Sequence, residues 1–326
     1  MENIQEEIIE QSGFLAKPEL IEDKKSWMRK TLFNLAIYIF IFLVILKIEL
    51  IYGAALLIVL LIHELGHFLA MKYFNYSNPK LFTLPLLGSF NAGKENSTIT
   101  QRQMSTIILA GPLPGIIIGM AMLITNNYYP SERLEMLGNI FVGLNFFNLL
   151  PFMPLDGGRL LETLFVNQNY VLRLVFTIIS IAFLVLLAIQ LRNIFFLIIP
   201  ATMVLELISE TKNQRIRDYL LQERINYNVD YKKLPDKDYW FIRDCILLSF
   251  NKRYAMVPAG EHKYTIIENS LMQHVIAIIR TPVIGDLKVI GKFLMLMVLI
   301  AFLIIPVMYY IPQAIELINT SHSLTK

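Results

Sequence analysis

The sequence predicts an all-α polytopic membrane protein with about seven transmembrane helices. Of its 326 residues, 55% are hydrophobic and only 17% are charged, and the mean hydropathy is +0.53. In a typical soluble domain about a quarter of the residues are charged. Long apolar runs recur along the chain, and basic residues are concentrated in alternate connections between them. Together these observations favour a multi-pass membrane protein over a soluble one.

Each apolar run is long enough, or nearly so, to cross a bilayer as a helix of about 20 residues. The runs lie at roughly 32–52, 53–74, 104–125, 137–155, 171–191, 193–210 and 287–311. The sequence between the second and third runs, 81–90, contains Pro85 and Gly88 and suits an extended segment. One interpretation is a small re-entrant β segment there, which could pair with an unwound substrate through Leu86 and Leu87. The alternative is a plain interfacial loop.

Basic residues predict the orientation of the chain. Lys24, Lys25, Arg29 and Lys30 precede the first run, which places the N-terminus in the cytoplasm. The apolar run that follows this tail is too long for the core of a cleaved signal peptide. The predicted location is therefore that of an integral multi-pass protein, in a bacterial cytoplasmic membrane.

Composition divides the chain into five expected parts. They are a cytoplasmic N-terminal tail (1–30), a six-helix membrane core (31–210), a small, mostly helical cytoplasmic domain (211–286), a final transmembrane helix (287–312) and a short outer tail (313–326). The segment 211–286 is the one stretch with ordinary soluble composition, and it has apolar residues at helical spacing.

Charge and cysteine content exclude some functions. The net charge of +3 is too small to indicate nucleic-acid binding. Cys245 is the only cysteine, so the chain can form neither an intramolecular disulfide nor a cysteine-based zinc site. Any metal site must therefore use His, Asp or Glu.

The second run contains such a set in VLLIHELGHFLAMKYF, residues 59–74. His63, Glu64 and His67 form an H-E-x-x-H pattern. Residues i and i+4 share one face of a helix, so both imidazoles can bind one metal ion while Glu64 acts as general base. The plainer interpretation is two buried histidines that are hydrogen-bonded to neighbouring carbonyls. Ionisable groups at membrane depth usually carry a function, which favours the metal site.

The best candidate for a third ligand is Asp156, in NLLPFMPLDGG (148–158). Pro151 and Pro154 interrupt the helix, and a broken helix at membrane depth is tolerated only where it is buried or lines a cavity. The alternative is that Asp156 only caps the next helix.

These two motifs resemble those of the site-2 protease family of intramembrane zinc metalloproteases, over about residues 50–165. The resemblance implies that His63, His67 and Asp156 hold one zinc ion, that Glu64 is catalytic, and that transmembrane protein or peptide substrates are cleaved near the cytoplasmic face of the bilayer. Many members carry G-P-x-x-N in the third span, where this chain has Gly111, Pro112 and then Gly115 at the asparagine position. Asn148 matches the second motif and is the better candidate for substrate binding.

Two other functions stay open at this point. A prenyl-protein-protease type of membrane metalloprotease would take a downstream glutamate, Glu206 or Glu210, as third ligand. A non-proteolytic metal-binding adaptor would bind transmembrane segments without cleaving them, although it would have no need of Glu64. The oligomeric state and the substrate's identity are not indicated by any residue pattern.

Overall fold

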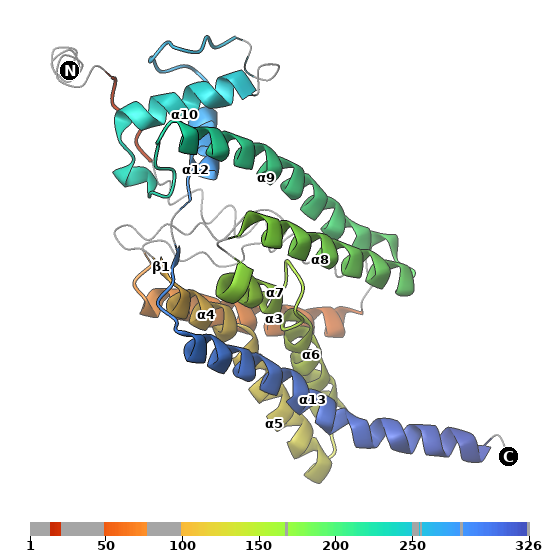
Figure 1. Ribbon diagram of the computed structural model, residues 1–326. Helices are drawn as coiled ribbons and strands as arrows, with labels where there is room; N and C mark the ends of the chain where they lie inside the picture. The colour runs from red at the N-terminus through yellow and green to blue at the C-terminus, as the bar shows by residue number, and fades with distance from the viewer. Residues whose placement is uncertain are drawn as a thin grey trace. The chain divides into compact units, whose positions relative to one another are not determined.

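The computed structural model describes residues 14–20, 49–76, 99–166, 169–249, 254, 256–280 and 283–324 (Figure 1). Its chain divides into two compact units. The first contains residues 1–23 and 205–283, and the second contains 24–204 and 284–326. The predicted domain limits themselves stay predictions.

The second unit consists mainly of helices, with one larger and one smaller cluster of buried apolar residues among those described. The helices are α3 (Leu50–Tyr73), α4 (Gln101–Ala110), α5 (Pro112–Tyr128), α6 (Glu132–Asn148), α7 (Asp156–Leu161), the π-helix η2 (Glu162–Val166), α8 (Tyr170–Gln190), the 3₁₀ helix η3 (Ile194–Leu197), the first part of α9 (Ile198–Gln222) and α13 (Val289–Leu324). Short strands β1 (Ile99–Thr100) and β2 (Val283–Ile284) pair with each other.

Local sequence explains how α4 and α5 meet. Thr100 accepts a hydrogen bond from the backbone of Gln103, whose side chain bonds back to Thr100, so a capping box starts α4. Pro112 ends the α4 hydrogen-bond pattern and stands at the first position of α5, where its missing N–H costs nothing. The two helices together form one apolar stretch, Gln101–Tyr128, long enough to cross a membrane.

The larger of these clusters joins helices that are far apart in sequence. Its buried members come from α4, α5, α7, η2 and α13 and the residues next to them; they are Ile108, Leu109, Ile116, Leu149, Leu160, Leu164, Leu287 and Leu299. The last helix therefore packs against the same core as α4 and α7.

Five described helices are long and apolar enough to cross a membrane. They are Leu50–Tyr73, Gln101–Tyr128, Tyr170–Gln190, Ile194–Gln222 and Val289–Gln313. The expected first span, 32–52, lies almost wholly outside the described residues. The expected span 137–155 corresponds to α6, which has only 17 residues and ends at Asn148, before the prolines. The predicted count of about seven is thus not confirmed.

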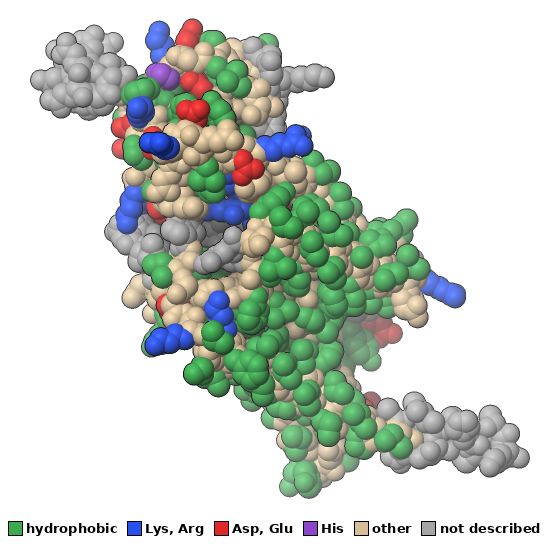
Figure 2. Space-filling model, viewed as in Figure 1, with side chains coloured by type: hydrophobic (Ala, Val, Ile, Leu, Met, Phe, Trp, Pro, Cys, Tyr) green, Lys and Arg blue, Asp and Glu red, His purple; other side chains and the backbone are tan. Residues whose placement is uncertain are grey.

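The outer faces of several of these helices are apolar, which suits contact with lipid (Figure 2). On α8 the exposed large side chains are Val171, Leu172, Val175, Ile178, Ile179, Leu186 and Ile189. The chain is a membrane protein by this pattern. The segment 81–90, with its expected β segment, lies outside the described residues.

The first unit has its own core. It contains α10 (Asp236–Ser249), α12 (Glu268–Ile278), the 3₁₀ turn η4 (Tyr231–Lys233) and the later part of α9. The Arg243 guanidinium, 0% exposed, donates to both carboxylate oxygens of Glu268, at 3.0 and 3.2 Å. The Tyr239 hydroxyl donates to the same carboxylate at 2.7 Å. Burial raises the pKa of the Cys245 thiol to about 11, so this cysteine is a protonated packing residue at neutral pH.

Replacing Glu268 by alanine leaves the Arg243 charge buried without its partner. We expect this to cost about 3–5 kcal/mol in the free energy of unfolding of the first unit. The measurement is denaturant unfolding of the full chain in detergent, followed by Trp240 fluorescence in a Trp27→Phe background. Glu261→Ala is the matched control, since Arg243 uses only the backbone carbonyl of Glu261. Equal stability of the two variants would contradict this account.

Candidate metal centre

Helix α3 presents the H-E-x-x-H side chains inside the second unit. His63 and His67 are 4% and 3% exposed, and Glu64 is also buried. The helix is apolar along nearly its whole length, so polar groups at these depths must find partners within the protein. Spacing of four residues puts both imidazoles on one face of α3.

Asp156 is the first residue of α7 and follows the proline-containing loop 149–155. The N-cap position is Leu155, so the alternative of a capping aspartate is wrong. A Cβ on Gly157 would lie 2.0 Å from the carbonyl oxygen of Leu149, and one on Gly158 would lie 2.3 Å from the carbonyl carbon of Phe152. Only glycine allows the loop to fold back this closely on the first turn of α7.

Helix α8 holds the loop from its other side. The Met153 N–H donates to the Ser180 hydroxyl at 2.9 Å, and the rings of Phe152 and Phe183 stack at 3.7 Å between centroids. A salt bridge of 2.7 Å between Arg173 and Glu162 ties α8 to η2 as well. The position of Asp156 is therefore fixed by packing on both sides.

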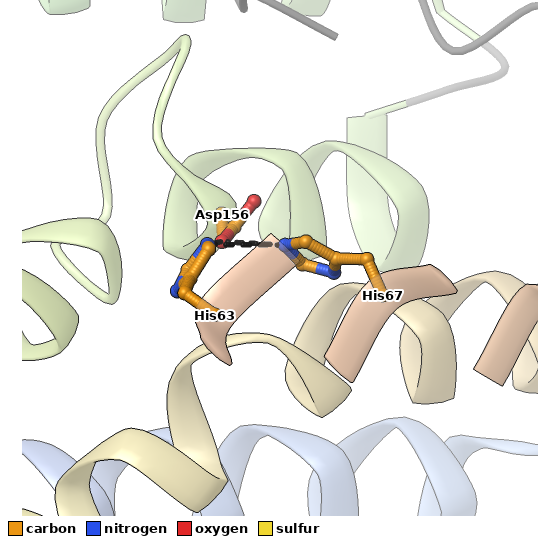
Figure 3. Close-up of side chains that lie close together, drawn as sticks. All are labelled: His63, His67 and Asp156. Atoms are coloured by element: carbon orange, nitrogen blue, oxygen red, sulfur yellow. Dashed lines mark hydrogen bonds and ion pairs between the residues drawn. The ribbon is translucent and has the colours of Figure 1, made fainter. Parts of the chain in front are cut away.

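The three predicted ligands converge on one point (Figure 3). His63 Nε2 lies 3.1 Å from Asp156 Oδ2, and His67 Nε2 lies 3.3 Å from the same oxygen. The two Nε2 atoms are 3.1 Å apart. Among the described residues these three are the group of His, Cys, Asp and Glu side chains placed to hold a metal ion.

Hydrogen bonds on the far side of each ring decide which nitrogen faces this point. The Nδ1 of His67 lies 2.8 Å from the Ile107 carbonyl, which can only accept. The Nδ1 of His63 lies 2.8 Å from the amide oxygen of Asn145, whose nitrogen donates to the Phe141 carbonyl. Both Nδ1 atoms must therefore carry the proton in neutral rings, which leaves each Nε2 with a lone pair.

This donor set fits a zinc ion. Three lone-pair acceptors face one another, and the buried Asp156 Oδ2 has no hydrogen-bond donor. Zinc takes His nitrogen and carboxylate oxygen at about 2.0–2.2 Å in a tetrahedron, in which neighbouring ligand atoms are about 3.3 Å apart. The observed separations of 3.1–3.3 Å agree with that spacing. A carbonyl or amide partner behind each histidine is the usual support of a metal ligand.

Two glycines make room for this arrangement. A Cβ on Gly111 would lie 2.3 Å from His67 Nε2, so the imidazole occupies the space of a side chain there. A Cβ on Gly115 would lie 2.1 Å from the amide nitrogen of Asn145. Gly115 stands where the G-P-x-x-N pattern has asparagine. Because it has no side chain, the amide of Asn145 from α6 occupies the space beside it.

Sequence reasoning missed Asn145 and the Ile107 carbonyl. The asparagine lies one helical turn before the predicted Asn148, within an apolar helix, and the glycine at 115 was the only available signal. Asn148 itself is half-buried, and its amide donates to the Leu144 carbonyl at 3.1 Å. Leu86 and Leu87 lie outside the described residues, so their predicted role in substrate pairing stays a prediction.

The candidates for a glutamate ligand have other surroundings. Glu210 accepts hydrogen bonds from Arg217 and Arg280 within the first unit, and Glu206 is exposed on α9. The structure brings neither into the described group of ligand atoms, so the prenyl-protein-protease type is not favoured.

The long apolar helices indicate a polytopic membrane protein. The buried cluster of two histidines and a carboxylate gives it a candidate metal centre. Residues 51–131, which include the H-E-x-x-H motif and end before Asp156, match the model of peptidase family M50. That segment, about a quarter of the chain, is similar to peptidase family M50.

Two curated relatives are similar to part of this chain. The chain is 35% identical over 115 residues to stage IV sporulation protein FB of Bacillus subtilis, which covers 35% of this chain and 40% of that protein. It is 33% identical over 116 residues to a zinc metalloprotease of Methanocaldococcus jannaschii, covering 33% of this chain and 32% of the relative. Each alignment thus spans less than half of the relative's length.

A solved structure was also found. The site-2 protease from Methanocaldococcus jannaschii is 26% identical, and the match covers 53% of this chain and 88% of that chain with a TM-score of 0.38. At this TM-score the superposition does not bear on the fold.

Replacing Gly111 by alanine should displace the His67 imidazole, because the new methyl group would overlap the ring. We expect an intact site to hold about one zinc ion per chain, and the zinc content of the purified variant to fall well below that. Gly143→Ala is the matched control, since nothing lies within 4 Å of a Cβ added there. The measurement is elemental analysis after dialysis. Equal zinc content in both variants would contradict the packing argument.

Replacing Asn145 by alanine removes the acceptor that fixes the His63 tautomer. We expect zinc affinity to fall by about 10–100-fold, the usual effect of losing such a partner. Competition with a chromophoric chelator measures this. Asn148→Ala is the control, since its amide bonds to its own helix; it should keep its zinc affinity. Equal weakening in the two variants would remove the special role of Asn145.

Proposed function

We propose that this chain is an intramembrane zinc endopeptidase that hydrolyses peptide bonds in or near transmembrane segments of proteins or peptides. The observation that carries the proposal is the convergence of His63, His67 and Asp156 from two separate helices on one point. The zinc metalloprotease named among the relatives supports the same chemistry.

In this proposal His63, His67 and Asp156 are the ligands of a single zinc ion, and Glu64 is the general base. A zinc ion held there would lower the pKa of a bound water to about 7 and polarise the scissile carbonyl. Glu64 follows His63 directly and is buried beside the ligands on α3. Its carboxylate would accept the proton of the attacking water and donate it to the leaving amine.

The burial of the site limits its substrates. A transmembrane helix hides its carbonyls in its own hydrogen bonds, so a segment must unwind before it is cleaved. The proposed substrate therefore lies in the bilayer beside the enzyme. We place cleavage near the cytoplasmic face, with the N-terminus of the enzyme in the cytoplasm of a bacterial cell, as the basic residues predict.

A non-proteolytic adaptor is the remaining alternative from another functional class. Such a protein would use the same ligands but would not need a buried carboxylate between them. Glu64 has an unfavourable position in an apolar helix unless it has a role there. This makes the enzyme the better-supported function.

Replacing Glu64 by glutamine separates these functions. The variant should bind zinc as the wild type does, because no ligand changes, while cleavage of a membrane-embedded reporter peptide should fall by at least about 100-fold with loss of the general base. Electrophoresis of the reporter after co-expression measures cleavage, and elemental analysis measures zinc.

Glu132→Gln, at the exposed start of α6, is the matched control and should retain activity. Asp156→Asn should lose zinc, whereas Glu206→Gln should keep it. Undiminished cleavage by Glu64→Gln would refute the proposed base.

A further inference from the structure

Residues 14–20 lie against the surface of the first unit although more than 200 residues separate the two parts in sequence (Figure 1, red). The segment forms neither helix nor strand. It contacts residues from η4, α10 and the loop that precedes α12.

Side chains of the unit bind the backbone of this segment. The Trp240 indole N–H donates to the Leu15 carbonyl at 2.6 Å, and the Tyr264 hydroxyl donates to the Ala16 carbonyl at 2.5 Å. The Tyr231 hydroxyl donates to the Pro18 carbonyl at 2.7 Å.

One contact runs the other way, from the Lys17 backbone N–H to an oxygen of Asp236 at 3.0 Å. The four consecutive residues 15–18 each have one backbone group bound by a side chain. Main-chain hydrogen bonds of this kind contribute affinity, and specificity comes from side-chain contacts.

The side chains of the segment add a simple chemical pattern. Phe14 and Leu15 pack against the core of the unit, and the Phe14 ring lies 4.8 Å from that of His262. The Lys17 ammonium donates to the Leu234 carbonyl at 2.6 Å, lies 3.8 Å from Asp236 and stands over the Tyr231 ring. The site thus accepts two apolar residues, a small residue and then a lysine.

The segment is peripheral to the fold it contacts. None of residues 14–20 is fully buried. Phe14 and Leu15, which contact the core, are partly buried. Tyr239, Trp240 and Leu234 are 0–1% exposed and belong to a core of buried residues drawn entirely from positions 216–279. The buried members of this core thus all come from the unit's own later residues, and the segment lies at the edge of the core.

The tyrosines that bind it are suited to act as donors. Burial raises the pKa of Tyr231, and burial followed by the charge of Asp236 raises that of Tyr264. Both hydroxyls keep their protons throughout the physiological range.

We propose that Tyr231, Asp236, Trp240 and Tyr264 form a binding site for a peptide segment, occupied here by residues 14–20 of the same chain and able to take a partner's segment in their place. The partner is a polypeptide whose segment carries two apolar residues, a small residue, a lysine and a proline. Its binding releases the N-terminal tail of this chain. The site shares no residue with the metal centre, and the proposal does not depend on peptidase activity.

The first experiment uses the full chain in detergent with residues 14–18 replaced by glycine and serine. The probe is a fluorescent peptide with the sequence of residues 13–21, GFLAKPELI. Fluorescence anisotropy should show saturable binding to this variant and at least tenfold weaker binding to the wild type, whose own segment competes. A scrambled peptide is the control and should not bind.

The second experiment removes single donors in the variant that binds the peptide. Tyr231→Phe and Tyr264→Phe keep the rings but lose the hydroxyls, and each should weaken binding by about three- to tenfold. Tyr254→Phe is the matched control, because that hydroxyl contacts His274 instead. A probe with an ester in place of the Lys17 amide lacks the N–H that Asp236 accepts and should also bind more weakly.

Two results would overturn the proposal. The first is equal binding of the scrambled and native probes, or no binding of either. The second is unfolding of the unit when residues 14–18 are replaced, seen as rapid cleavage within residues 205–283 during limited proteolysis of the variant but not of the wild type. In that case the segment is part of the fold.

Discussion

The lone pairs of His63, His67 and Asp156 face one another among largely apolar helices. Most of the structure around this candidate metal centre holds the three side chains in place. Each histidine is oriented from behind, one by a carbonyl of α4 and the other by an amide of α6. With the protons on the Nδ1 atoms, no proton is left to form a hydrogen bond among the Nε2 atoms of His63 and His67 and the carboxylate of Asp156. Three acceptors at 3.1–3.3 Å repel one another unless a cation lies between them. These three groups are therefore suited to hold a positive charge at that point.

Close approach of backbones makes this geometry attainable. The imidazole of His67 occupies the space that a side chain at Gly111 would fill, and the amide of Asn145 does the same at Gly115. Gly157 lets α7 start directly against the preceding loop. The loop is then held against α8 through Ser180 and Phe183. Helices that contribute no ligand thus still determine where the ligands lie, which is why substitutions outside the motifs are expected to affect metal binding.

The first unit follows different rules. It is stabilised by a core of large aromatic and aliphatic residues and by two buried arginines, Arg217 and Arg243, whose charges are met by glutamates and carbonyls. Such pairs add little net stability but are costly to break, so they favour one arrangement of the helices over others. On this surface the N-terminal segment is held mainly through its backbone, which is the form of contact that another peptide could replace.

The sequence by itself determined the membrane character, the helical class and the three candidate ligands. Long apolar runs have few alternatives to helices in a bilayer, and the i, i+4 spacing of His63 and His67 settles their shared face. It also singled out Asp156, because two prolines and two glycines mark a break at membrane depth. Only the tertiary structure decided which residues orient the ligands. Asn145 and the Ile107 carbonyl have no local pattern, since their partners are 82 and 40 residues away in sequence and any helix carries such groups. The attachment of residues 14–20 escaped sequence reasoning for the same physical reason, because backbone recognition leaves almost no trace in the bound sequence.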